Sequence, residues 1–162
     1  MAPLPIDRLY DDEGAWPRFA PSAGEPWTER EALRVRQLWM VLEAASPPGW
    51  RTRPRLGIRC GRGGFTPDLT TLPPGVPRAA GAWLDVVPTL VVEVESANSR
   101  TVDRGGKPEA YAAHGIPRYW RVEEDGAVVV HRLCGGRYEP ERFPPFEAVR
   151  LTVPYPLVIP SR

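Results

Sequence analysis

The sequence predicts an α/β domain in which a mixed central β-sheet is flanked by helices. Three features of the chain support this fold class. Apolar residues first recur at helical spacing over residues 29–45 and give way, after Trp50, to short strand-like segments. An almost wholly apolar segment at 90–95 is typical of a central strand, and a second helical segment follows it at 107–114.

The composition fits one domain that packs a core of its own. The chain has 162 residues, 42% of them hydrophobic, and its six Trp, five Tyr and four Phe argue against disorder in spite of 21 Pro and 15 Gly. No apolar run approaches the roughly 20 residues that a membrane span needs, and the start of the chain lacks the pattern of a signal peptide. We therefore expect a cytoplasmic protein without a membrane segment.

The charge balance gives no global preference for a polyanionic partner. With 21 basic and 20 acidic residues the net charge is +1, so nucleic acid, if bound, must be met by a local patch. Cys60 and Cys134 are too few for a disulfide framework and have no partner at metal-ligand spacing. We expect both to be free thiols.

The chain divides into an arm and a domain. Residues 1–27 are rich in Pro, Gly and Asp without sustained periodicity, which predicts an irregular N-terminal arm before a domain at 28–162. Thr28 and Glu31 have the spacing of a capping box, and the helix at 29–45 follows them. The face of this helix that we expect to be solvated carries Arg30, Arg34 and Arg36.

The next part of the chain has the pattern of short strands. Residues 53–59 and 65–72 predict two strands on either side of a glycine-rich turn at 61–64. Residues 73–88 contain so many prolines that we expect a loop that does not pair. The central strand at 90–95 comes next, and alternation places Glu93 and Glu95 on one of its faces.

The last third of the chain predicts a helix and a meander. The second helix should start near Lys107, because Pro108 fits only a first turn, and should end at Gly115. Strands are then expected at 119–123, 127–132 and from Arg137, with one further edge strand, broken by prolines, within 149–159.

Two carboxylates carry the argument for a metal site. Glu93 lies in the middle of an apolar strand, where an ionised side chain is costly unless it is paired or binds a metal. Asp68 follows Pro67 in the strand-like segment before it. If the two strands are neighbours, the acids converge. Oxygen ligands without a nearby His or Cys suit Mg²⁺ or Mn²⁺ rather than Zn²⁺.

The chain also contains one lysine among 20 arginines, Lys107. A compact, tunable ammonium differs from a guanidinium where a single point charge is needed. Lys107 follows two glycines at the entry to the second helix, where it could lie beside an attacking water or a phosphate. Asp68, Glu93 and Lys107 therefore form one candidate catalytic site.

Four stretches together resemble the Uma-two family of restriction-endonuclease-like proteins, within the PD-(D/E)xK nuclease superfamily. These stretches are Pro67-Asp68, then Leu90-Val91-Val92-Glu93-Val94 with Ser96, then Asp103-Arg104-Gly105-Gly106-Lys107 with Tyr111, and Gly115-Ile116-Pro117-Arg118-Tyr119-Trp120. The resemblance spans residues 29–140. It implies a three-layer restriction-endonuclease-like core, metal binding by Asp68 and Glu93, and Lys107 as the superfamily lysine. It further implies a DNA substrate, a Mg²⁺ or Mn²⁺ cofactor and a homodimer.

The sequence departs from the family pattern in two places. Glu95 stands where the superfamily usually has its lysine, and no hairpin with a glutamate separates Trp27-Thr28 from the first helix. Glu95 is accordingly a further candidate ligand or a partner for Arg104. Tyr111 could face either the site or the core, and Asp103 fits a cap or turn better than a ligand.

Less specific interpretations remain for each acid. Asp68 could bond local amides, and Glu93 could form a buried ion pair with an arginine. The missing hairpin glutamate favours a second hypothesis for the function: a catalytically inactive nuclease-like module that binds nucleic acid or a partner protein. A third hypothesis is that the protein is a structural or interaction domain whose acids only pair with arginines.

Overall fold

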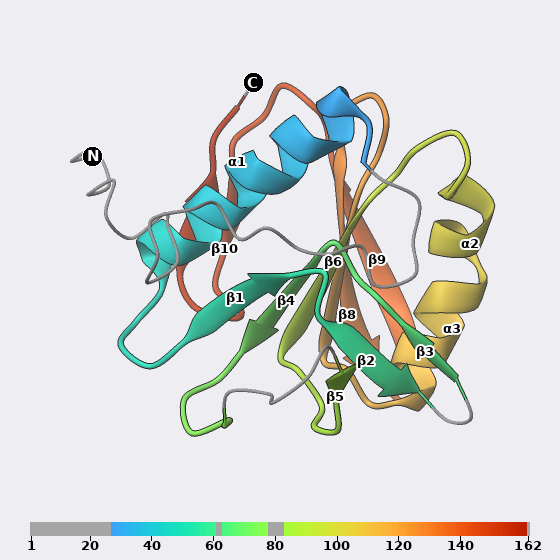
Figure 1. The fold of residues 1–162 in the computed structure, drawn as a ribbon. Coiled ribbons are helices and arrows are strands. Elements are labelled where there is room, and N and C mark those ends of the chain that lie inside the picture. Colours follow the sequence, from blue (N-terminus) through green and yellow to red (C-terminus); the bar gives the residue numbers. More distant parts are fainter. Residues whose placement is uncertain (1–26, 61–62, 78–82, 162) are drawn as a thin grey trace.

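A computed structural model of the chain describes residues 27–60, 63–77 and 83–161 (Figure 1). The predicted arm therefore lies, apart from Trp27, outside the described residues. The helices are α1 (Glu29–Ala45), α2 (Arg100–Arg104) and α3 (Gly106–Ala113). The strands are β1 (Arg51–Pro54), β2 (Gly57–Cys60), β3 (Gly63–Phe65), β4 (Leu69–Leu72), β5 (Trp83–Leu84), β6 (Leu90–Val94), β7 (Arg118–Val122), β8 (Val128–Cys134), β9 (Arg137–Phe143), β10 (Val149–Leu151) and β11 (Leu157–Ile159).

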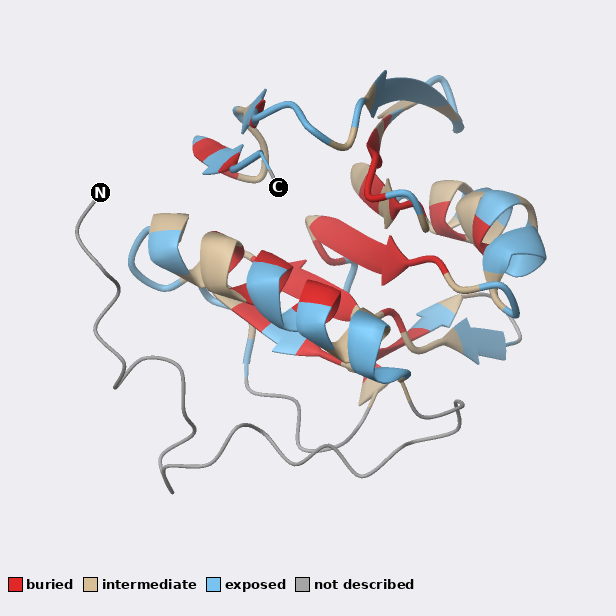
Figure 2. Cartoon of the chain, turned by 90° about the horizontal axis from the view of Figure 1, so that it is seen from above, coloured by how far each residue is buried: buried red, intermediate tan, exposed pale blue. Residues whose placement is uncertain are grey.

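The central sheet is mixed, as the sequence predicts. Within the described residues it contains six strands in the order β1-β4-β6-β7-β8-β9, in which β6 and β7 are parallel and the other neighbours antiparallel. The strands β7, β8 and β9 form the expected meander. Strand β6 lies inside the sheet and all five of its residues are buried, which confirms its predicted central position (Figure 2).

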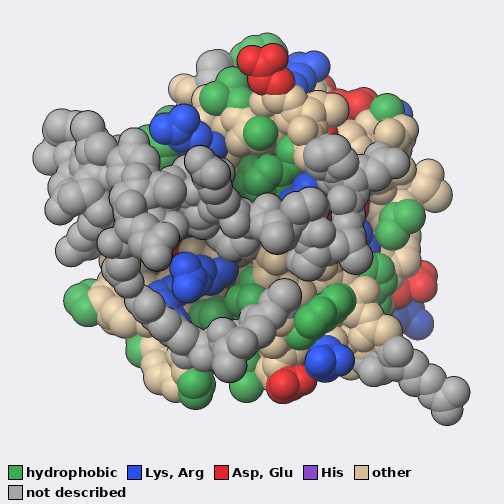
Figure 3. All heavy atoms as spheres, viewed as in Figure 1, with side chains coloured by type: hydrophobic (Ala, Val, Ile, Leu, Met, Phe, Trp, Pro, Cys, Tyr) green, Lys and Arg blue, Asp and Glu red, His purple; other side chains and the backbone are tan. Residues whose placement is uncertain are grey.

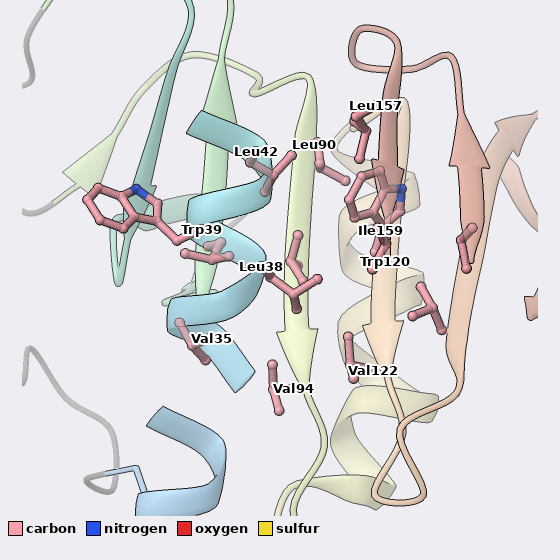
Figure 4. Close-up of a cluster of buried hydrophobic side chains, with 14 of the residues drawn as sticks. Val35, Leu38, Trp39, Leu42, Leu90, Val94, Trp120, Val122, Leu157 and Ile159 are labelled. Atoms are coloured by element: carbon pink, nitrogen blue, oxygen red, sulfur yellow. The ribbon is translucent and has the colours of Figure 1, made fainter. Parts of the chain in front are cut away.

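Helix α1 covers one face of this sheet. Thr28 and Glu31 form the predicted capping box, with Thr28 N donating to Glu31 Oε2 at 2.7 Å. Figure 4 shows Leu42 of α1 beside Leu90 of β6, with Leu38 farther along the same strand. The antiparallel pair β10 and β11 joins the same apolar layer, and Tyr155 Oη donates to the backbone of α1 at 2.7 Å.

The opposite face carries α2, α3 and a smaller sheet. In the described part of the chain, this sheet consists of β2 between β3 and β5. Tyr111 of α3, Ile58 of β2 and Val91 of β6 belong to one buried cluster. Because side chains alternate along β6, Val91 and Glu93 face this side while Leu90, Val92 and Val94 face α1.

Two predicted strands turn out to be one long bent hairpin. The segments expected at 53–59 and 65–72 are each divided between two sheets, β1 and β4 in the central sheet and β2 and β3 in the smaller one. The register is continuous across the bend: Pro54 pairs with Leu69, and Ile58 pairs with Phe65. Arg55 and Asp68 mark the bend. Periodicity does not reveal it, because the two arms of the hairpin stay paired in the same register on both sides of the bend.

Other differences from the sequence predictions have local causes. Helix α2 was missed because five residues are too few to show a helical period, and α3 begins at Gly106 with Pro108 in its first turn. Strand β5 pairs within the proline-rich loop, parallel to β2. The tail forms two strands rather than one.

Arg34 was wrongly expected to be solvated. Its guanidinium is buried and donates to the backbone oxygens of Glu123 and Glu124 at 2.9 and 2.7 Å. Cys60 and Cys134 are free thiols. In the described ranges of the chain, no helix is both long and apolar enough to cross a membrane.

Candidate active site

Glu93 lies in β6, and Asp68 directly precedes β4, the antiparallel neighbour of β6. Leu69 of β4 pairs with Val92 of β6, so the next step of the same register sets Asp68 opposite Glu93. Val94 N donates to Asp68 Oδ2 at 2.7 Å, which fixes the aspartate against the end of β6. The two acids were predicted to converge if these strands are neighbours, and β4 and β6 are paired.

Both acids and Lys107 line one pocket of about 350 Å³. Lys107 is the second residue of α3, and its side chain is 16% exposed. Its Nζ lies 2.9 Å from Glu93 Oε2 and 2.6 Å from Asp103 Oδ1. Burial alone would lower the pKa of Lys107, but Glu93 and Asp103 raise it, so the ammonium stays charged.

Glu93 is a strongly perturbed acid of the pocket. Tyr111 Oη donates to Glu93 Oε1 at 2.6 Å, so Tyr111 faces the site and also packs in the core. Burial raises the pKa of Glu93 to about 8, and although Lys107 opposes this shift, Asp68 and Asp103 add to it by repulsion. The neighbouring carboxylates of Asp68 and Asp103 thus disfavour a further negative charge on Glu93.

Asp68 is held by two donors. Besides Val94 N, the indole Nε1 of Trp27 donates to Asp68 Oδ1 at 2.5 Å. Burial raises the pKa of Asp68, while these hydrogen bonds and the charges of Lys107 and Arg55 act in the opposite direction. Each carboxylate oxygen accepts one hydrogen bond and keeps a further lone pair.

Glu95 lies on the same strand face as Glu93 but is not among the residues that line this pocket. Arg104 Nε and Nη2 donate to its two carboxylate oxygens at 2.5 and 2.9 Å, and Arg121 Nε lies 3.2 Å from Oε1. The expected partnership with Arg104 is therefore present.

Glu123 extends this arginine network. Burial would raise its pKa, but hydrogen bonds from Arg142 and Arg121 hold it below its usual range.

Asp103 was expected to be a cap or turn residue and instead lies inside α2, fully buried. Its carboxylate contacts Lys107 and accepts a hydrogen bond from Ser99 Oγ, and its backbone oxygen accepts one from Tyr119 Oη at 2.8 Å. Asp103 is thus placed, together with Glu93, to position the ammonium of Lys107.

The pocket also contains residues that the sequence did not single out for it, among them Trp27, Glu31, Arg55 and Ser99. Glu31 was recognised only as a capping residue. Trp27 had been assigned to the irregular arm, and no local pattern indicates its bond to Asp68. A lone arginine such as Arg55 carries no signal in a chain with 20 of them.

The donor set fits a hard divalent cation better than zinc. The described residues contain no group of three or more His, Cys, Asp or Glu side chains placed to hold a metal ion. Asp68 and Glu93 alone would supply carboxylate oxygens. Mg²⁺ suits such a site because it keeps several waters and commonly takes only one or two carboxylates from the protein.

The described cations do not form one continuous basic surface on the face of the molecule that Figure 3 draws. On the face drawn in Figure 3, Lys and Arg side chains lie in separate groups, several of them beside acidic side chains. This agrees with the near-neutral net charge and gives weight to the cations inside the pocket.

The fold is that of an α/β protein with a mixed central sheet, and comparison with known proteins gives the family. The family model described as "Uma2: Putative restriction endonuclease" matches residues 8–159. The chain belongs to this family, which confirms the resemblance found in its motifs.

A solved structure has the same fold. It is the crystal structure of a putative nuclease belonging to DUF820 from Anabaena variabilis, which superimposes with a TM-score of 0.66 and 17% sequence identity. The alignment covers 80% of this chain and 75% of that one. A search of curated proteins finds no match.

Proposed function

We propose that this protein is a metal-dependent endonuclease that hydrolyses DNA phosphodiester bonds in the pocket lined by Asp68, Glu93 and Lys107. One observation carries the proposal. Two carboxylates from adjacent strands and a buried ammonium, 2.9 Å from one of them, meet in a single pocket of a chain whose family is described as restriction endonucleases. Asp68 and Glu93 would hold Mg²⁺ or Mn²⁺.

In this proposal the acidic and basic residues of the pocket have different roles. Such a cation, when bound, polarises a phosphoryl oxygen and lowers the pKa of a coordinated water. Lys107 would stabilise the negative charge that develops on the phosphate, and Asp103 holds its ammonium in place at 2.6 Å. Tyr111 and Val94 N fix the two carboxylates, so the site needs little rearrangement.

Calorimetric titration with Mn²⁺ and plasmid nicking test this proposal together. We expect wild type to bind Mn²⁺ and to nick plasmid DNA, and Asp68→Asn to lose both. Asp85→Asn is the matched control, because Asp85 is 81% exposed and lies outside the pocket. Equal Mn²⁺ binding by wild type and Asp68→Asn would exclude the metal site.

The same experiment distinguishes the proposed nuclease from the alternative function. A wild-type protein that binds DNA but nicks none under any divalent ion would be the catalytically inactive module. The family resemblance also leads us to expect a homodimer, which sedimentation analysis of the full chain would detect.

A further inference from the structure

The bend of the long hairpin places one arginine in an unusual backbone conformation. Arg55 follows the last residue of β1, and its N donates to the backbone oxygen of Asp68 at 3.2 Å across the bend. Its φ of 47° lies in the left-handed region, which residues other than glycine rarely adopt. Such residues often occur at functional sites, where the surrounding structure holds them in place.

The side chain of Arg55 is held next to the metal-binding acids. Its guanidinium carbon lies 4.3 Å from the ring centroid of Trp27, and Trp27 in turn donates to Asp68. A guanidinium stacked on an indole face keeps its donors at the edges of the stack. Arg55 and Trp27 both line the pocket that contains Asp68, Glu93 and Lys107.

The pocket is lined by several acids, so a polyanion such as DNA needs a cation there to bind. Among the described residues that line it, the positive charges belong to Arg55 and Lys107, and the acids are Glu31, Asp68 and Glu93. Lys107 is in contact with Glu93 and Asp103, and the charge of Arg55 acts on Asp68. A planar guanidinium matches a phosphate with two parallel hydrogen bonds, which an ammonium does not provide.

We propose that Arg55, stacked on Trp27, binds a phosphate group of the DNA strand that enters the pocket and so positions the strand against Asp68 and Glu93. This inference rests on the proposed function. It assigns Arg55 a substrate-positioning role and explains why a left-handed position is occupied by arginine where glycine would fit the backbone better.

Binding of a fluorescently labelled DNA duplex tests this role. Arg55→Gln should weaken binding about tenfold, as expected for one charge-assisted hydrogen-bonded contact. It should also reduce the slope of log K against log salt by about 0.9, the value for one phosphate contact. Arg53→Gln is the control, because Arg53 is exposed on β1, makes the same change in net charge and lies outside the pocket.

A second variant separates this role from a structural one. Arg55→Gly relieves the left-handed conformation, so its melting temperature should be at or above that of Arg55→Gln while DNA binding falls equally. A purely structural Arg55 would lower the melting temperature in both variants and leave the salt slope unchanged.

The outcomes distinguish this inference from the proposed function. Equal binding and equal salt slopes for Arg55→Gln and Arg53→Gln would overturn it even if wild type nicks DNA. Absence of DNA binding by wild type would overturn it as well. Weak binding by Arg55→Gln, together with a wild type that binds DNA but never nicks it, would support the phosphate contact and remove hydrolysis.

Discussion

Glu93 and Glu95 lie two residues apart on one face of one strand segment, yet their surroundings differ completely. Glu93 faces a pocket, where one ammonium and one phenol contact it and where burial raises its pKa to about 8. Glu95 faces two guanidinium groups and lies outside that pocket. A buried carboxylate with full cationic pairing is structural, whereas one with incomplete pairing beside a second acid is suited to bind a cation.

The largest expected effect is on the paired acid. Glu95→Gln removes one of the two carboxylates that lie 3.2 Å from the guanidinium of Arg121, which is 12% exposed, and breaking a buried ion pair from one side costs about 3 kcal/mol. Chemical denaturation would measure the loss in unfolding free energy. Unchanged stability would show that Glu123 is sufficient for the arginines.

Lys107→Arg tests the pocket that contains Glu93. The planar fork cannot occupy the point between Glu93 and Asp103 that the ammonium fills, and a misplacement of about 1 Å can cost on the order of a hundredfold in rate. We expect unchanged melting temperature and Mn²⁺ affinity but loss of most plasmid nicking. Nicking equal to wild type would remove Lys107 from the mechanism.

Glu93→Gln should act in the opposite direction to Glu95→Gln. In metal-free protein at pH 7 we expect a gain of up to about 3 kcal/mol, because pH 7 lies about 2.5 units above the ordinary pKa of a glutamate and each unit corresponds to about 1.4 kcal/mol. The same variant should bind no Mn²⁺. Strong destabilisation of the metal-free variant would instead indicate that Glu93 serves as the partner in a structural ion pair with Lys107.

The pH dependence follows from the same raised pKa. Below about pH 4.5 Glu93 is protonated in both folded and unfolded chains. As the pH rises toward 8 the unfolded chain loses this proton first, so the free energy of unfolding falls. Asp68 contributes with the same sign. Denaturation in EDTA at pH 5 and pH 8 should show a smaller decrease for Glu93→Gln than for wild type.

The smallest effect is expected for Tyr111→Phe. It removes the donor to Glu93 Oε1, a single hydrogen bond worth about 1 kcal/mol, while the ring stays in the core. Since that bond lowers the pKa of Glu93, its loss should move the pH-dependent decrease in stability to higher pH. A decrease at the same pH as in wild type would show that the bond does not tune Glu93.

Much of the fold is readable from local patterns. The capping box and apolar spacing predict α1, and the apolar run predicts a central β6 because only a strand buried on both faces tolerates it. The bend that divides the long hairpin between two sheets was not predicted, and this too has a physical reason. The hairpin stays extended and paired in one register past the bend at Arg55 and Asp68, so no change of period indicates that it passes from one sheet to the other.

The sequence by itself determined which side chains are exceptional. An acid within an apolar strand, an aspartate after a proline and one lysine among arginines are visible without any structure, because each contradicts its local surroundings. Only the tertiary structure decided which of them meet and with what. Strand register sets Asp68 opposite Glu93, and α2 brings Asp103 to Lys107. Tertiary contacts also pair Glu95 with Arg104 and Arg121. Contacts between segments that are distant in the sequence bring Trp27 and Arg55 to the pocket, and no local pattern predicts them.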